Sequence, residues 1–368
     1  MIRKGLLVCV FIFMSYISFS QSMENINIDS NLTDFEINFH DSVTLINKYN
    51  EMIYHSRKEY NSGIEKLNNN NLDDAIKSFS NSILIDSTFS KAYFYRGKCY
   101  DFFDDSLAIV NYTIAFRYDS TDFSPIYAIA NIQSMFDVEE AINIYNFIIS
   151  SSKNESKAYY ELGVLFYNQM YYHKAITAFS TSINIKKEAR IYNDRASCYR
   201  MIEDIDLAIK DYTTAIKLDS TLAFIYNNLA SVYKNIDDVD SALHYYNLAI
   251  YYDKNYIHAI NNRAALYIQL NAFEKAIIDI DQVISINTEY APAYNNKAVI
   301  FHKKKEYDQA LYFFDIAIAL DSSYAKAFLN RGITKQIMRN EEGACQDWNK
   351  ASKLGINLAN NYFSNDCK

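Results

Sequence analysis

Glycine and proline are scarce in this chain of 368 residues. It has 7 Gly and 2 Pro, where average usage would supply roughly 26 and 18. A fold that needs many tight turns, such as a β-sandwich or a barrel, is therefore disfavoured. No two glycines lie closer together than Gly332 and Gly343, which excludes the glycine-rich loops that bind dinucleotides or nucleotide phosphates.

Motifs for catalysis and metal binding are missing as well. The six histidines form no HExxH or His-x-His spacing, and no two cysteines make a Cys-x-x-Cys pair, which are the spacings that hold metals in many proteins. Serine, histidine and aspartate have no catalytic motif around them. We therefore predict a protein that is not an enzyme, with no catalytic residue, no metal and no cofactor.

The chain is acidic but rich in core-forming residues. Half of its residues are hydrophobic, 33 are Tyr and 23 are Phe, so the main state is folded. The net charge is −8, and we find no basic stripe that would attract phosphate backbones. Nucleic acid is not expected among its partners.

The N-terminus resembles a secretory signal peptide over residues 1–20. Arg3 and Lys4 precede an apolar run that ends in small residues at Ser18 and Ser20, the pattern that signal peptidase reads. No second long apolar stretch follows Gln21. Cleavage would give an exported protein without stable membrane insertion, periplasmic or extracellular, with a net charge of −10. An uncleaved signal that anchors the protein in the inner membrane is the alternative.

A repeat of 33 or 34 residues governs the rest of the chain. Each period has a small residue and then, 11 or 12 residues later, an alanine that is followed by a bulky residue four positions on. This spacing predicts two antiparallel helices in each unit, whose small residues allow close approach while the bulky ones fill the groove between neighbouring units. The alanines are Ala75, Ala108, Ala141, Ala175, Ala208, Ala242, Ala276, Ala310 and Ala344.

The pattern resembles the tetratricopeptide repeat (TPR), of an exported bacterial type. In one unit it comprises Tyr226, Leu229, Ala230, Tyr233, Ala242, Tyr246 and Ala249. The resemblance implies an all-α superhelix, a solenoid of about nine helix-turn-helix units with a C-terminal capping helix. Serine stands where the family usually has proline, mostly after Asp, and Asp-Ser makes a turn through side-chain to backbone bonding.

The same frame divides the chain into regions. An N-terminal segment, 21–55, contains a predicted capping helix from His40 to His55, and the array covers 56–355, followed by a cap or tail over 356–368. The third unit, with Pro125 near its start, is either a kink between two sub-arrays or a diverged unit that packs normally. The predicted units are 56–89, 90–122, 123–155, 156–188, 189–222, 223–256, 257–290, 291–324 and 325–355.

Asparagines recur on the predicted first helices, which line the concave groove in such arrays. An amide side chain donates and accepts hydrogen bonds, as an extended peptide backbone requires. The second member of each pair is similar to the asparagine ladder of O-linked N-acetylglucosamine transferases, which holds peptide backbone. Bonding to a neighbouring helix is the alternative role. The predicted peptide-binding residues are Asn193, Asn227, Asn228, Asn261, Asn262, Asn295, Asn296 and Asn330, with Asp194 in the equivalent place one unit earlier.

Basic residues do not form the arrangement by which some members of the family bind the acidic tails of chaperones. The corresponding positions hold Asn, Asp, Phe, His and Pro. The other groove candidates, His258, His302, Lys234 and Lys303, are scattered along the sequence, and we expect them to be solvated.

Four cysteines remain beyond the signal peptide. Cys99 and Cys198 occupy equivalent positions three units apart, too distant for a disulfide, and are predicted to be core residues. A terminal helix over 356–366 would bring Cys367 to Cys345, leaving a disulfide or two free thiols as the alternatives.

The resemblance implies a non-catalytic scaffold or adaptor of the cell envelope. Its concave groove would bind a peptide segment or a helix of a partner protein. The alternative is a structural component of a larger envelope complex that assembles through its convex or end surfaces.

Overall fold

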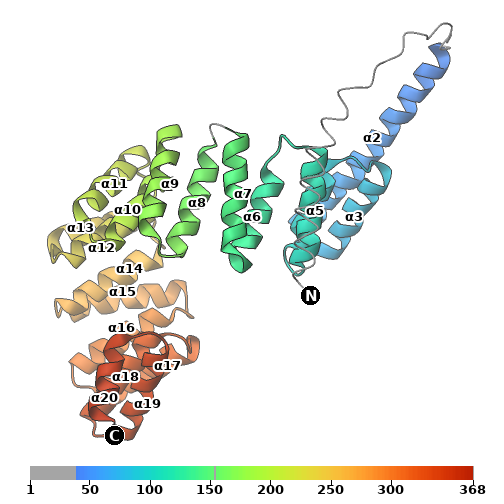
Figure 1. The fold of residues 1–368 in the computed structure, drawn as a ribbon. Helices are drawn as coiled ribbons and strands as arrows, with labels where there is room; N and C mark the ends of the chain where they lie inside the picture. The colour runs from blue at the N-terminus through green and yellow to red at the C-terminus, as the bar shows by residue number, and fades with distance from the viewer. Residues whose placement is uncertain (1–38, 153–154, 368) are drawn as a thin grey trace. The chain divides into compact units, whose positions relative to one another are not determined.

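The computed structural model describes residues 39–152 and 155–367, and these contain helices but no strands. The predicted all-α repeat architecture is confirmed (Figure 1). The predicted signal peptide lies outside the described residues. None of the helices in the described ranges combines the length and the apolar character needed to cross a bilayer.

The chain divides into two compact units, Met1–Thr121 and Asp122–Lys368. Consecutive helices pair within each unit, α2 with α3 and α4 with α5 in the first, and α6 with α7 through α18 with α19 in the second. A last helix, α20, packs on α19. The helices of the first unit are α2 (Phe39–Asn68), α3 (Leu72–Ile85), α4 (Ser90–Tyr100) and α5 (Asp105–Tyr118). Those of the second unit are α6 (Ser124–Phe136), α7 (Val138–Ser151), α8 (Ser156–Asn168), α9 (Tyr172–Ile185), α10 (Ala189–Met201), α11 (Ile205–Leu218), α12 (Ala223–Asn235), α13 (Val239–Tyr252), α14 (Ile257–Gln269), α15 (Phe273–Ile286), α16 (Ala291–Lys303), α17 (Tyr307–Leu320), α18 (Ala325–Ile337), α19 (Glu341–Lys353) and α20 (Asn357–Asp366).

The helix predicted as a separate N-terminal cap, from His40 to His55, is instead the first half of α2. This helix continues without interruption to Asn68, because no glycine or proline stands between the expected cap and the first repeat. Ser56, near its middle, is buried and donates to the carbonyl of Ser82 in α3 at 3.1 Å. The first helix of the first repeat is therefore extended by several turns.

Small residues of each first helix face bulky residues of its second helix. A Cβ added to Gly163 would come within 2.6 Å of the Phe179 ring, and one added to Gly332 within 2.5 Å of Trp348. Ala264 instead shares its core with the smaller Ile280, and both are fully buried. Other first-helix alanines share their cores with aromatic residues, Ala230 with Tyr246 and Ala298 with Phe314. A small residue of the first helix thus packs with a large residue of the second.

Turns in this array rely on side chains rather than on glycine or proline. Asp219, after α11, accepts a hydrogen bond from the backbone N of Thr221 at 2.9 Å, as the predicted Asp-Ser turns require. In seven of the repeats, a residue other than glycine takes a positive φ between the two helices. These residues are Asn70, Met170, Glu203, Asp237, Asn271, Lys305 and Arg339.

Pro125 lies in the first turn of α6. A backbone N–H at this position would have no partner within the helix, so a residue without an N–H is tolerated there. The fixed φ of proline also suits a helix start. Helix α6 packs against α7 like the other pairs, and the boundary between the compact units falls just before it, after Thr121.

Candidate functional site

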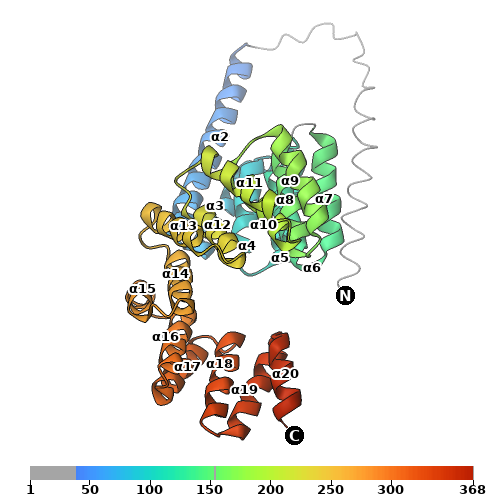
Figure 2. The same cartoon turned by 90° about the vertical axis from the view of Figure 1, so that its left-hand side faces the viewer.

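First helices of consecutive repeats face one another along the second unit. Each helix from α8 to α16 that begins a repeat also packs against the first helix of the next repeat. Second helices of consecutive repeats show no comparable packing within the described ranges. The first helices therefore lie on the inner, concave side of this run, where α12, α14, α16 and α18 follow one another (Figure 2). We call the surface of α10, α12, α14, α16 and α18 the inner face.

Asparagine pairs on the inner face bond across each repeat boundary. The second amide of a pair donates through Nδ2 to the first amide of the preceding repeat. Asn228 donates to Asn193 at 3.0 Å, and Asn262 to Asn227 at 2.9 Å. The series continues with Asn296 to Asn261 at 2.8 Å and Asn330 to Asn295 at 3.0 Å. We call these eight residues the asparagine ladder.

The first member of each pair is not on the accessible surface, contrary to its predicted role in peptide contact. Asn193, Asn227, Asn261 and Asn295 are only 4% to 7% exposed, and their side-chain oxygens accept from the next repeat. An α-helix turns about 100° per residue, so adjacent asparagines cannot both point into the groove. These four hold the repeats together.

The second member of each pair is half-buried on the inner face. Asn228, Asn262, Asn296 and Asn330 each use one amide hydrogen for the bond across the boundary. An asparagine side chain has two donor hydrogens and an oxygen with two lone pairs. The bond therefore fixes the orientation of each amide and engages one of its hydrogen-bonding positions.

The ladder ends at a carboxylate in α10. Asp194 accepts from the Tyr160 hydroxyl and from Asn193 Nδ2, both at 2.9 Å. Burial raises the pKa of Asp194, and the two hydrogen bonds oppose that rise. Asp194 thus occupies the place in the ladder that its sequence position predicts, with a tyrosine as its partner in α8.

Arginines that the sequence analysis missed tie three helices together. Arg263 on α14 forms a bidentate pair with the buried Asp279 of its own second helix, at 2.7 and 2.9 Å. Its remaining terminal nitrogen donates to Asn247 of the preceding repeat at 2.6 Å. The same arrangement occurs one repeat pair before and after, at Arg195 with Asp211 and at Arg331 with Asp347. In the sequence, Arg and Asp recur at these positions in every second repeat, and this recurrence could have predicted the ion pairs.

Of the four groove candidates expected to be solvated, His258 and Lys303 are exposed, whereas Lys234 and His302 are half-buried. Lys234 on α12 is half-buried, and burial, followed by the charge of Lys326 on α18, lowers its pKa. His302 Nδ1 lies 2.9 Å from Thr334 Oγ1. The Thr334 hydroxyl donates to the Asn330 carbonyl, so His302 Nδ1 carries the proton of that contact. Burial and then Lys303 lower the pKa of His302.

Sequence comparison identifies the repeat. The profile of the tetratricopeptide repeat matches residues 189–222, 225–256 and 257–290, which include three successive helix pairs of the inner face. These three segments of the chain are tetratricopeptide repeats. No curated protein matches the sequence of the chain.

Solved structures share the TPR fold. The chain is similar to one in the crystal structure of the APC/C hetero-tetramer Cut9–Hcn1, with a TM-score of 0.54, 13% identity, and coverage of 85% of this chain and 76% of the other. This likeness shows the fold alone. Pseudomonas aeruginosa pilF gives a TM-score of 0.48 with 17% identity over 58% of this chain and 97% of its own. Yeast Tom70 gives 0.46 with 12% identity over 84% and 94%.

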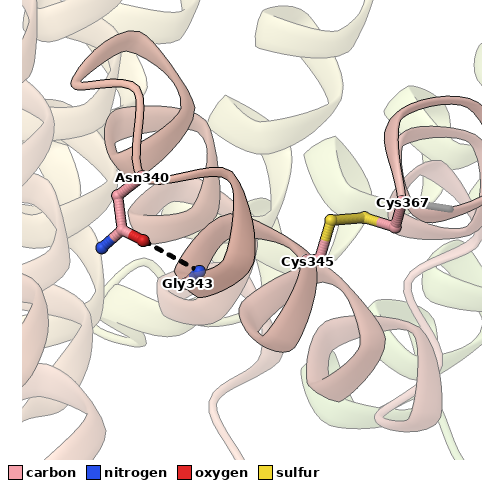
Figure 3. The surroundings of a disulfide bond; sticks show 4 residues. All are labelled: Asn340, Gly343, Cys345 and Cys367. Atoms are coloured by element: carbon pink, nitrogen blue, oxygen red, sulfur yellow. Dashed lines mark hydrogen bonds between the residues drawn. A yellow bond between two sulfur atoms is a disulfide. The ribbon is translucent and has the colours of Figure 1, made fainter.

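The C-terminal end of the TPR array carries a disulfide. Cys345 of α19 is bonded to Cys367 just after α20, with a Cα–Cα distance of 5.6 Å (Figure 3). The Asn340 side chain caps α19 by accepting from Gly343 N at 3.0 Å. The Trp348 and Tyr362 rings stack between the same helices. The terminal helix is therefore fixed to the last TPR unit by a covalent bond and an aromatic contact.

Cys99 and Cys198, the other two cysteines of the described residues, are free and buried, in the core as predicted. Burial raises the pKa of Cys99 to about 11 and that of Cys198 to about 12. Neither thiol is a nucleophile near neutral pH. Across the described residues, no His, Cys, Asp and Glu side chains gather in a group that would hold a metal ion.

Proposed function

We propose that this TPR protein is a non-catalytic scaffold whose inner face binds an extended segment or a helix of a partner protein. TPR arrays use extended concave surfaces for binding. The observation that carries the proposal is the half-buried series Asn228, Asn262, Asn296 and Asn330, with one amide per repeat oriented by the repeat before it. Such a row of amides meets the backbone of a ligand whatever its side chains are.

We also propose that the protein is exported to the periplasm or the cell exterior. The signal-like sequence of residues 1–20 and the disulfide between Cys345 and Cys367 support this proposal, since disulfides persist in oxidising compartments. The mature N-terminus would be Gln21. N-terminal sequencing of the protein from its native cells tests this, and an intact Met1 would instead favour the anchored form.

Site-specific photo-crosslinking tests the inner face without breaking the ladder. A photoreactive residue is placed in the full chain at exposed inner-face positions, His258 or Gln269, and in matched variants at exposed second-helix positions, Lys275 or Gln309. Each variant is irradiated in native envelope extract, and its adducts are identified by mass spectrometry. We expect the same partner segment at both inner positions and at neither outer position.

A second experiment uses two multiple variants. In the ladder variant, alanine replaces Asn228, Asn262, Asn296 and Asn330 together. In the control variant, alanine replaces the exposed second-helix residues His244, Lys275 and Gln309. Melting curves show whether each variant is folded before its partners are compared. Loss of the crosslinked partner from the folded ladder variant supports groove binding. Adducts only at Lys275 and Gln309 would instead favour a structural component that assembles through its convex side.

A further inference from the structure

Charge is segregated between the two helices of the last four repeats. The first helices α12, α14, α16 and α18 contain no Asp or Glu and seven Lys or Arg. Their second helices α13, α15, α17 and α19 contain nine Asp or Glu and three Lys. An acidic protein therefore has a basic inner face, a distribution that the net charge conceals.

Four of the seven inner cations are neutralised by the second helices. Arg263 pairs with Asp279, Lys297 with Asp281, and Arg331 and Lys335 share Asp347. These pairs belong to the framework of the array. The carboxylates of these pairs belong to the second helices, and they hold the four cations against those helices.

Three lysines are left without an acidic partner. Within the described residues, Lys234, Lys303 and Lys326 form no ion pair, and Lys303 contacts only the amide oxygen of Asn271, at 3.5 Å. Lys234 is half-buried, while Lys303 and Lys326 are exposed. A partly desolvated ammonium without a counter-charge is unfavourable, so a carboxylate that reached Lys234 would be bound with more than surface strength.

The three lysines lie on α12, α16 and α18, first helices of one run in which α12 packs on α14, α14 on α16 and α16 on α18. The charge of Lys326 adds to burial in lowering the pKa of Lys234. His302, which bonds to Thr334, lies on α16 between them along the chain. On the stretch of the inner face from α12 to α18, the uncompensated lysines therefore share their helices with the ladder amides Asn228, Asn296 and Asn330.

We propose that this stretch selects an acidic segment of a partner protein, whose Asp or Glu side chains meet Lys234, Lys303 and Lys326 while its backbone meets the ladder amides. The inference rests on the proposed function and adds the chemistry of the ligand. Opposite charge on the ligand would also speed its association and exclude basic segments.

The test is selection from a displayed library of random peptides of about 16 residues, which span roughly 50 Å when extended. The full chain is panned beside K234Q/K303Q/K326Q, the charge-conserving K234R/K303R/K326R, and K210Q/K217Q/K275Q, which removes three exposed lysines from second helices. Melting curves verify that each variant is folded. We expect peptides enriched in Asp and Glu from wild type, from the arginine variant and from the outer control.

The affinity of a selected peptide should fall about tenfold or more in K234Q/K303Q/K326Q, as the sum of three weak to moderate ion pairs. Selected peptides without acidic enrichment that still lose affinity in the ladder variant would overturn this inference and leave the proposed function standing. If the selected peptides bound the ladder variant and K234Q/K303Q/K326Q as tightly as wild type, or if no peptide were selected, the result would count against both the acidic-segment proposal and the proposed function. Tighter binding of a labelled single-stranded oligonucleotide would overturn the choice of a protein partner.

Discussion

Asn296 donates its amide hydrogen to Asn261 Oδ1 over 2.8 Å, across the boundary between two repeats. The acceptor is buried and the donor is half-buried on the inner face. The side chain of Asn261 therefore supports the array, while that of Asn296 is oriented on the inner face, where we propose that a ligand binds. In this proposal, stability and recognition depend on the same hydrogen bond.

Replacement of the buried acceptor should destabilise the protein. Asn261→Ala removes the partner of Asn296 and leaves a buried gap, so we expect the free energy of unfolding to fall by about 1–3 kcal/mol. Urea denaturation followed by circular dichroism measures the change. Gln309→Ala, at an exposed site on α17, serves as the control. Equal effects of the two substitutions would contradict a role for the buried amide.

The packed pair of a small and a large side chain in one repeat can be replaced by the pair found in another repeat. Gly163→Ala forces a Cβ to within 2.6 Å of Phe179 and should lower stability by about 1–3 kcal/mol. Another repeat has alanine and isoleucine at these positions, Ala264 and Ile280. The double variant Gly163→Ala, Phe179→Ile should therefore lose less than the sum of the single changes. Additive losses in a double-mutant cycle would show that the two sites do not share a packing constraint.

Asp194 makes stability depend on pH. Its pKa is raised in the folded protein, chiefly by burial, so the folded state binds its proton more tightly than the unfolded chain does. This group then favours folding at low pH, and that contribution is lost as pH rises through the folded pKa. Asp194→Asn, which supplies the residue found in the later repeats, should be more stable than wild type at neutral pH. The advantage should shrink as pH falls toward the ordinary aspartate value of 3.8, and a constant difference in denaturation midpoints would contradict this.

Glycine substitutions at the positive-φ turn positions should raise the stability of the protein. Met170 has φ of 60° and is 73% exposed, so Met170→Gly relieves the left-handed conformation and loses little packing. The steric relief of roughly 1–2 kcal/mol exceeds the entropic penalty of glycine, roughly 0.5–1 kcal/mol. We expect a net gain of about 0.5 kcal/mol in thermal unfolding. Asn271→Gly should gain less, because asparagine tolerates this conformation, and the reverse order would refute the explanation.

Removal of the disulfide should release the terminal helix. The bond closes a loop with a sequence separation of 22, for which the chain-entropy estimate is about 3 kcal/mol. In Cys345→Ser we expect faster hydrogen exchange in α20 than in α14, measured by mass spectrometry. Reduced wild type should behave like this variant, since Cys99 and Cys198 are free in both states. Unchanged exchange in α20 would mean that the Trp348–Tyr362 stack is sufficient to hold it.

The repeat fold could be predicted because its determinants are regular in sequence. The small residues and the alanines recur every 33 or 34 positions, and each pair of helices needs the same contacts as the next. The separation of roles within the asparagine ladder could not be predicted in this way. Asn227 and Asn228 share one period, and the rotation of the helix decides which of them is buried.

Other features depend on contacts that a single period does not reveal. The pair formed by Arg263 and Asp279 joins different helices and recurs only in every second repeat. The effect of Lys326 on the pKa of Lys234 joins residues three repeats apart. Both features depend on how different helices are placed, which the sequence of one repeat does not contain.

The ladder also affects how easily whole repeats can be added to such an array. Each repeat from α12 to α18 brings a donor asparagine for the unit before it, and those from α12 to α16 also bring an acceptor for the unit after. A tandem duplication of residues 257–290 would carry both halves of the boundary with it, Asn261 and Asn262. The inserted unit would meet its neighbours through bonds that already exist, so this part of the chain is suited to growth by whole repeats without the invention of a new interface.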